Sequence, residues 1–222
     1  FELGPTDWMV EGKPFGRVET GFANALDSVW PQIERILGGI DMSGKKGILV
    51  TGHSKGAAMT FLAASRLKSA APERLVEVCC FAAPMTCDAT FQARYDALGL
   101  RPFTVRYQNR YDIIPYLPWW PALLLAANAE RMSGKAQTLR LTRDVWPETG
   151  DPESDNLYKP IGILRYLADK CVVEYGEQGA DDAWSALKYA LEHLEFETIA
   201  EAHSAAGRYL TCVCDGCDSS GD

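Results

Sequence analysis

The chain has 222 residues, of which 47% are hydrophobic, and its 22 basic and 30 acidic residues give a net charge of −8. This composition allows a substantial buried core and excludes the disordered and fibrous classes of protein. Because the balance is acidic and no run of Lys or Arg occurs, we expect no nucleic-acid partner. No apolar run reaches the length of a membrane-spanning helix, and we expect one domain over residues 1–222.

The cysteines give an expectation about redox environment. Their number is odd, which excludes a complete disulfide framework and favours a reducing compartment. Three of them fall in residues 211–222, which we expect to be a flexible tail with no metal, because no second cysteine pair accompanies them. The chain begins with Phe1 and has no signal peptide, so we expect the natural product to start earlier, and secretion stays open. The seven are Cys79, Cys80, Cys87, Cys171, Cys212, Cys214 and Cys217.

The first elements are a loop and a helix. Residues 1–17 are rich in Gly and Pro, and we expect a lid-like loop around Trp8. From Gly21 to Gly39, apolar residues recur at helical spacing. Pro31 falls inside this pattern, so we expect a kink or two consecutive helices.

Residues 47–56 are the most informative stretch of the chain. Ile48 to Val50 form a short apolar run typical of a fully buried strand, and Gly52-His53-Ser54-Lys55-Gly56 follows directly. Good helix formers occupy residues 57–68. A G-x-S-x-G sequence between a strand and a helix predicts a nucleophile elbow, in which side chains at both glycines would collide with the neighbouring elements.

The next elements predict a parallel sheet. Residues 75–81 form a second apolar run, residues 91–98 a short helix, and residues 103–108 alternate as a strand does. Strands that alternate with helices imply an α/β fold with parallel strands and right-handed crossovers. Reacting groups gather at the carboxyl ends of such strands, where Ser54 and Asp112 both lie.

Residues beyond 115 interrupt this rhythm. The apolar stretch with Trp119, Trp120 and Leu124 opens an insertion over residues 119–157 that either packs onto the core or binds acyl chains. Residues 162–175 predict a β-hairpin, and residues 181–194 an amphipathic helix.

A serine nucleophile needs a base and an orienting carboxylate, which on this kind of sheet follow in the order acid, then histidine. Of the three histidines, His53 is badly placed to reach the adjacent hydroxyl, and His193 lies opposite an apolar helix face. His203 is therefore the candidate base by elimination. Asp112 is the first candidate acid, and Asp88, after the preceding strand, is the alternative.

The residues of this site resemble those of class 3, or fungal-type, lipases of the α/β-hydrolase fold, from about Trp8 to Tyr209. By this resemblance Ser54 is the nucleophile, Asp112 the orienting acid and His203 the base. The motifs that carry the resemblance are Gly21-Phe22, Val50-Thr51-Gly52-His53-Ser54-Lys55-Gly56-Ala57, Phe81-Ala82-Ala83-Pro84, Asn109-Arg110-Tyr111-Asp112-Ile113-Ile114-Pro115, Tyr158-Lys159-Pro160-Ile161-Gly162, and His203-Ser204 with Tyr209.

The chain also departs from the family. The family's strand ending in Arg-Gly-Thr/Ser, which supplies an oxyanion donor, has no counterpart here, whereas Asp7-Trp8 is similar to the Asp-Trp that follows it in the lid region. The backbone N–H of Lys55 is the one oxyanion donor that we name. Lys55 itself replaces the usual Leu.

The sequence thus predicts a serine hydrolase of lipid carboxylic esters, with an acyl-enzyme and no metal or organic cofactor. The resemblance implies a lipid or small ester substrate bound near Trp8, Trp119, Trp120 and Leu124, with transient contact to a lipid interface. Two alternatives are a phospholipase or acyltransferase with the same triad, and a lipase-like binding module without turnover.

Overall fold

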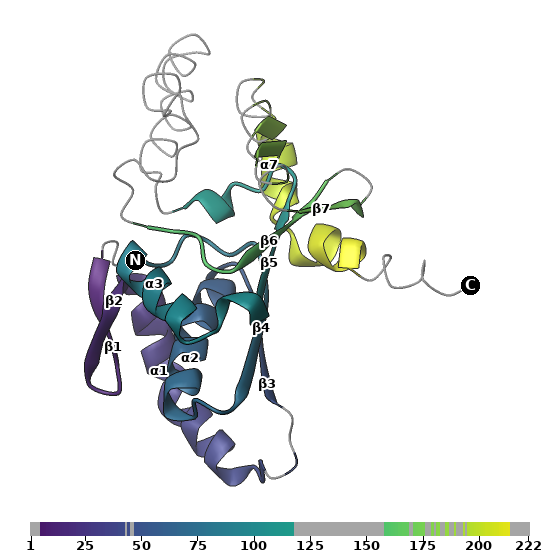
Figure 1. Cartoon of the computed structure of the whole chain (residues 1–222). Helices are drawn as coiled ribbons and strands as arrows, with labels where there is room; N and C mark the ends of the chain where they lie inside the picture. The colour runs from purple at the N-terminus through teal and green to yellow at the C-terminus, as the bar shows by residue number, and fades with distance from the viewer. Residues whose placement is uncertain are drawn as a thin grey trace.

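The computed structural model describes residues 5–42, 44, 47–117, 158–168, 171–175 and 195–213, with seven isolated positions between 179 and 193. Helices lie on both faces of a central sheet, and a two-stranded hairpin lies beside the helices of one face (Figure 1). The elements in chain order are β1 Pro5–Val10, β2 Lys13–Glu19, α1 Thr20–Gly39, β3 Gly47–His53, α2 Lys55–Ala70, β4 Leu75–Phe81, α3 Ala89–Ala97, η1 Arg101–Phe103, β5 Thr104–Asn109, η2 Ile114–Tyr116, β6 Ile163–Leu167, β7 Val173–Tyr175, α7 Phe196–Ala202 and η4 Ala205–Tyr209.

The five-stranded sheet has the order β3-β4-β5-β6-β7. The first four strands are parallel, and β7 pairs antiparallel with β6 as the predicted hairpin. Since parallel strands end at one edge, the residues that follow β3, β4 and β5 meet there. The expected parallel α/β sheet is therefore present.

The expected loop over residues 1–17 is wrong for the residues that the structure describes. Strands β1 and β2 pair as an antiparallel hairpin, and Glu11 and Gly12 between them have φ of 50° and 72°. Positive φ at both central residues is the requirement of a type I′ turn, the favoured two-residue hairpin connection. Along β1, Trp8 and Val10 alternate with exposed residues and point into the core. Gly12, which suggested an irregular loop in the sequence, instead forms part of the tight turn between β1 and β2.

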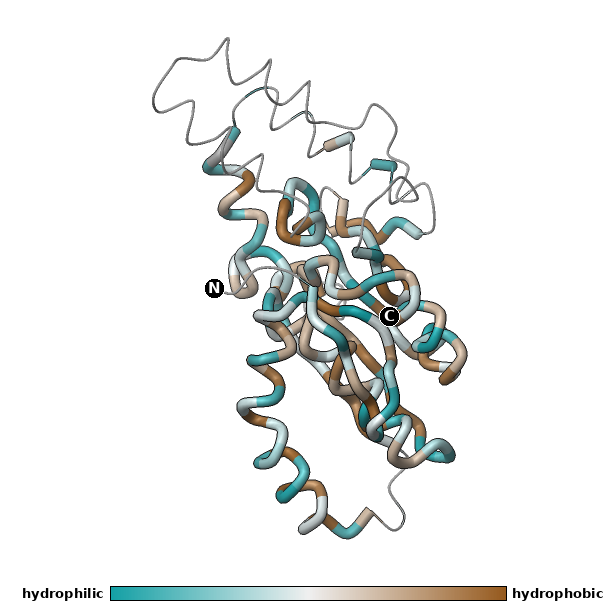
Figure 2. Tube along the Cα trace, turned by 90° about the vertical axis from the view of Figure 1, so that its left-hand side faces the viewer, coloured by the Kyte–Doolittle hydropathy of each residue, from teal (hydrophilic) through white to brown (hydrophobic). Residues whose placement is uncertain are grey.

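The main core lies between the sheet and helices α1, α2 and α3. Hydrophobic residues concentrate along the strands and along the helices packed against them (Figure 2). Helix α2 contributes to this core through Ala57, Ala58, Phe61, Leu62 and Ala64, all at most 1% exposed. Helix α1 is one helix through Pro31, not two.

The C-terminal elements α7 and η4 lie across the sheet from this core (Figure 1). Tyr209 of η4 forms a second buried cluster with Ala82 and Leu167, and Phe81 and Tyr107 pack against it. This cluster covers the sheet at the carboxyl ends of its strands, where the predicted site lies.

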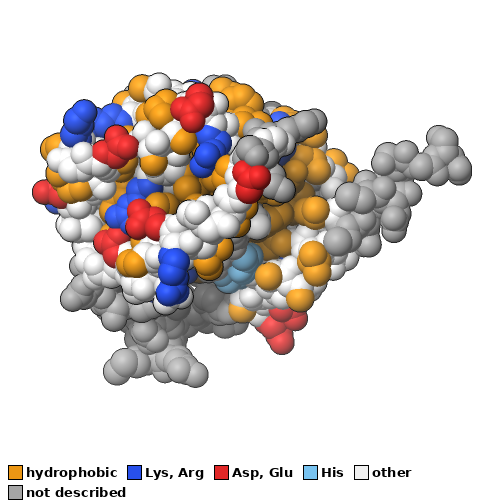
Figure 3. Space-filling model, turned by 90° about the horizontal axis from the view of Figure 1, so that it is seen from below, with side chains coloured by type: hydrophobic (Ala, Val, Ile, Leu, Met, Phe, Trp, Pro, Cys, Tyr) orange, Lys and Arg blue, Asp and Glu red, His pale blue; other side chains and the backbone are white. Residues whose placement is uncertain are grey.

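Strand β3 is not fully buried, contrary to the expectation from its apolar run. It lies at the end of the described sheet order, and Leu49 is 64% exposed. The lower end of the molecule, seen in Figure 3, carries exposed hydrophobic side chains among charged ones. In the part of the chain that the structure describes, no helix combines the length and apolarity needed to cross a membrane.

Candidate active site

Ser54 lies on a sharp turn between β3 and α2. Its φ of 56° and ψ of −124° are strained for a residue with a side chain, at a cost of about 1–3 kcal/mol. The turn brings the strand and helix so close that a Cβ on Gly52 would lie 2.5 Å from the backbone of Gly56. This is the geometry of a nucleophile elbow, which lifts the serine hydroxyl above the sheet.

Gly56 differs from the expectation that side chains at both glycines would collide. A Cβ built on Gly56 has no atom within 4 Å, apart from its own helix and chain neighbours. The close approach involves the Gly56 backbone, and the Cβ that would meet it belongs to Gly52. Only Gly52 is therefore required by sterics.

Strain recurs at the carboxyl ends of all three neighbouring strands. Ala82 after β4 and Tyr111 after β5 have φ of 53° and 67°, like Ser54 after β3. Strained residues persist only where the surrounding structure holds them in place, and they are concentrated at functional sites. At Tyr111, the turn places Asp112 next to the end of β5.

Asp112 is buried and surrounded by hydrogen-bond donors. Its Oδ1 accepts from the main-chain N–H of Ile114 at 2.9 Å, and both carboxylate oxygens are 3.1 Å from Nδ1 of His203. Hydrogen bonds to a carboxylate are stronger than neutral ones, so they fix its orientation. The alternative acid, Asp88, instead caps α3 by accepting from the Phe91 N–H at 2.8 Å.

His203 follows α7 and joins the other two groups. Its Nε2 is 2.9 Å from Ser54 Oγ, and its Nδ1 faces Asp112. Because a carboxylate accepts, Nδ1 carries the proton, which leaves Nε2 as the acceptor for the serine hydroxyl. The structure thus brings the three residues predicted for the site into one hydrogen-bonded chain.

Tyr209 also belongs to this hydrogen-bonded series, although the sequence analysis assigned it no role beyond the motif. Its hydroxyl donates to Asp112 Oδ2 at 2.5 Å and accepts from the Asn109 N–H at 2.8 Å. Burial first, and then the charge of Asp112, raise the pKa of Tyr209 well above 10, so its phenol stays a donor. Its place six residues after His203 was the only signal in the sequence.

The helix behind the elbow provides positive potential. Lys55 is the first residue of α2, whose 16 residues align their peptide dipoles with the N-terminus next to Ser54. The N-terminus of α2 therefore stabilises an oxyanion that forms on a substrate carbonyl attacked by Ser54. The backbone N–H of Lys55, the residue after Ser54, stays our predicted donor to this oxyanion.

Trp8 does not lie over this site. It is 2% exposed, donates to Ser65 Oγ at 3.2 Å, and has the guanidinium of Arg66 4.1 Å above its ring. Ser65 is about 15 Å along α2 from the elbow, at 1.5 Å per residue. The expected substrate contact of Trp8 is therefore wrong: its alternation along β1 directs it into the core. Trp119, Trp120 and Leu124, with the expected insertion, lie outside the described residues.

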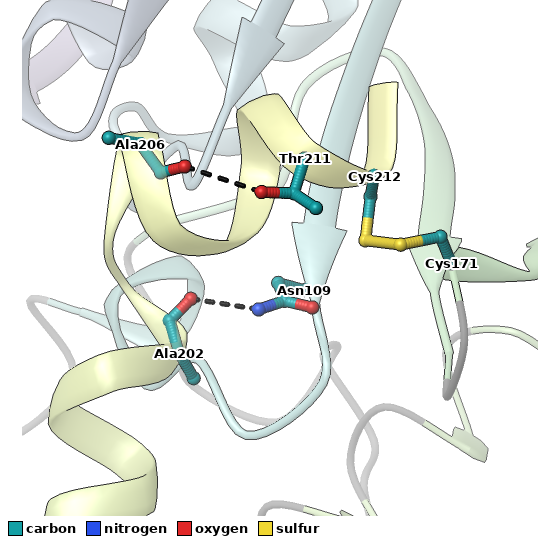
Figure 4. The surroundings of a disulfide bond; sticks show 6 residues. All are labelled: Asn109, Cys171, Ala202, Ala206, Thr211 and Cys212. Atoms are coloured by element: carbon teal, nitrogen blue, oxygen red, sulfur yellow. Dashed lines mark hydrogen bonds between the residues drawn. A yellow bond between two sulfur atoms is a disulfide. The ribbon is translucent and has the colours of Figure 1, made fainter. Parts of the chain in front are cut away.

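The cysteines differ from the expected free tail. Cys171, before β7, forms a disulfide with Cys212 (Figure 4). The partners are 41 residues apart, so their spacing does not reveal the pairing. A disulfide is typical of an oxidising environment, so it counts against the reducing compartment that the odd cysteine count favoured. Cys214 and Cys217 lie outside the described residues.

Two further observations concern other ligands and the remaining histidine. Within the described ranges, no group of three or more His, Cys, Asp or Glu residues is placed to hold a metal ion. His193 is exposed and stacks on Tyr189 at 3.9 Å, as a surface residue does.

Comparison with known proteins connects this geometry to a family. Residues 3–121 match the family model described as "Lipase (class 3)". None of the curated protein sequences compared with the chain matches it.

Solved structures show the same fold. The triacylglyceride lipase from Rhizomucor miehei is similar with a TM-score of 0.52 and 19% identity, over 76% of this chain and 51% of that one. The mono- and diacylglycerol lipase from Aspergillus oryzae gives 0.51 and 20%, over 80% and 51%. The chain thus spans about half the length of these lipases, and the likeness establishes the α/β-hydrolase fold.

Proposed function

Because the chain belongs to the class 3 lipase family, we propose that it hydrolyses carboxylic esters of lipids with Ser54 as nucleophile, His203 as base and Asp112 as orienting acid. The observation that carries this proposal is the hydrogen-bonded chain from Ser54 Oγ through His203 to Asp112, with distances of 2.9 and 3.1 Å. A serine hydroxyl is a weak nucleophile until an adjacent base takes its proton.

In the first half of the reaction, Ser54 Oγ attacks the ester carbonyl while its proton moves to His203 Nε2. The imidazolium that results is stabilised by Asp112, and the carbonyl oxygen becomes an oxyanion next to the N-terminus of α2. When the carbonyl re-forms, the bond to the alcohol breaks, and His203 gives its proton to the leaving oxygen. The products of this half are an acyl-enzyme and an alcohol.

In the second half, water attacks the acyl carbonyl and gives a proton to His203 Nε2. The tetrahedral intermediate then releases Ser54 Oγ, which takes the proton back, and a fatty acid leaves. Throughout, the Tyr209 hydroxyl donates to Asp112 and accepts from the Asn109 N–H, and neither group gains or loses a proton in these steps.

The test is hydrolysis of p-nitrophenyl butyrate and palmitate by the wild type, Ser54→Ala and His203→Ala. Loss of the nucleophile or of the base lowers kcat by about a millionfold. Ser28→Ala is the matched control, because Ser28 is an exposed serine on α1 that hydrogen-bonds its own helix. We expect activity in the wild type and control only, and the ratio of the two esters measures chain-length preference. A folded wild type that neither hydrolyses the esters nor reacts with a fluorophosphonate would refute the proposal and favour a binding module.

A further inference from the structure

A row of aromatic side chains lies beneath the segment that carries His203. His53, Phe81 and Tyr107 are register partners on β3, β4 and β5. Register partners in a parallel sheet project from the same face, so the three side chains lie side by side at its carboxyl edge. The rings of Phe81 and Tyr107 stack with centroids 5.2 Å apart.

The C-terminal segment is packed onto this row. The ring of Tyr209 meets His53 and Phe81 edge-on, with centroids 5.6 and 6.0 Å away. The His203 ring lies 4.7 Å from that of His53. The row therefore supports both the candidate base and the tyrosine that holds its acid.

Two consecutive carbonyls at the end of α7 are hydrogen-bonded to the ends of two strands. The side-chain amide of Asn109, the last residue of β5, donates to the oxygen of Ala202 at 3.0 Å (Figure 4). His53, the last residue of β3, donates from Nε2 to the oxygen of His203 at 3.0 Å. Together these bonds hold the backbone on which the His203 side chain pivots.

His53 differs from Asn109 in being joined to Ser54 by a peptide bond. A shift of His203 away from the elbow must therefore break the bond to His53 or move the nucleophile with it. At neutral pH the His53 imidazole is uncharged and still donates its Nε2–H to the His203 carbonyl. Burial, and then the neighbouring His203 ring, lower the pKa of His53 from its ordinary value, whereas the hydrogen bond to the His203 carbonyl, and then the charge of Asp112, oppose this shift.

We propose that His53 is a positioning residue, whose Nε2–H holds the main chain of His203 at the height where its own Nε2 meets the Ser54 hydroxyl. It touches neither substrate nor the transferred proton. The inference rests on the proposed function, because it concerns the base of that reaction.

The proposal distinguishes three substitutions of His53. Leu fills similar space without a donor. In Gln, the amide nitrogen reaches about as far as imidazole Nε2, whereas in Asn it reaches only as far as Nδ1. A buried acceptor left without its donor costs enough to lower kcat by about 10- to 100-fold.

The experiment measures kcat and KM of the full chain with p-nitrophenyl butyrate, and the rate of fluorophosphonate labelling. His53→Leu and His53→Asn should lower kcat and labelling by about 10- to 100-fold with little change in KM, while His53→Gln stays within about threefold of the wild type. His193→Gln is the control, since it removes an exposed histidine from another element.

The outcomes separate this inference from the proposed function. Equal losses in the Gln and Asn variants would overturn it, because the donor would then not be the cause. Wild-type kcat in the Asn variant would overturn it as well, and this holds even where the Leu variant does not fold. A wild type that is inert to ester and probe would instead refute the proposed function.

Discussion

Replacing Tyr209 by Phe removes one hydroxyl from the centre of the proposed site. That hydroxyl joins the Asn109 N–H to a buried oxygen of Asp112. Each buried polar group left without its partner costs about 1–3 kcal/mol. We expect the free energy of unfolding to fall by about 3 kcal/mol, and Tm by about 6–12 °C for a chain of this size. If the loss of the hydroxyl misorients Asp112 and raises the activation free energy by about 1.4 kcal/mol, kcat falls about tenfold.

Thermal unfolding followed by circular dichroism, together with p-nitrophenyl butyrate hydrolysis, measures both effects in one preparation. Tyr175→Phe removes the same atom from a residue that is 60% exposed on β7, and should change neither Tm nor kcat. If Tyr209→Phe is as stable and as active as this control, the hydroxyl does not hold Asp112, and the argument fails.

Three other changes test the frame around the site. Reduction of the Cys171–Cys212 disulfide releases a loop closed over 41 residues, so stability should fall by about 4 kcal/mol. A Cys171→Ser, Cys212→Ser chain whose Tm still responds to reductant would contradict this. Gly52→Ala should abolish esterase activity because its Cβ meets backbone at 2.5 Å, whereas Gly56→Ala, with open space, should retain it. Equal activity in the two would show that the elbow is not tight. Because the pKa of His53 is lowered, the unfolded chain binds more protons there than the folded one. Its stabilising contribution is complete above about pH 6.5 and is lost as the pH falls toward the folded pKa. The wild-type Tm should thus drop more between about pH 7 and 5 than that of His53→Gln, and equal drops would refute the assignment.

Local patterns predicted much of the architecture. The apolar run before Ser54 and the helix formers after it predicted a strand, elbow and helix, because these signals act within a few residues. Alternation of strands and helices then implied parallel strands with a common carboxyl edge. Because the chain has only three histidines and the acid is expected at this carboxyl edge, few pairs of base and acid were possible.

Contacts between distant segments needed the tertiary structure. The bonds from His53 to His203 and from Tyr209 to Asp112 join residues 150 and 97 positions apart, and neither periodicity nor composition records such a pairing. The disulfide was missed for the same reason. The number of cysteines shows whether all of them can pair, but it does not show that Cys171 and Cys212 lie 4.8 Å apart at Cα.

The sequence by itself determined the strand, turn and helix around Ser54 and the order of the reacting residues, because turn chemistry, helix propensity and strand periodicity are properties of short segments. Only the tertiary structure decided what each side chain faces. Trp8 lies in a segment whose composition suggested a lid, but its side chain is packed against α2. His53 is adjacent to Ser54 in the sequence, but its side chain is hydrogen-bonded to the main chain of His203. In both, the direction of the side chain depends on how the sheet and helices pack, and packing sums many weak contacts from the whole chain.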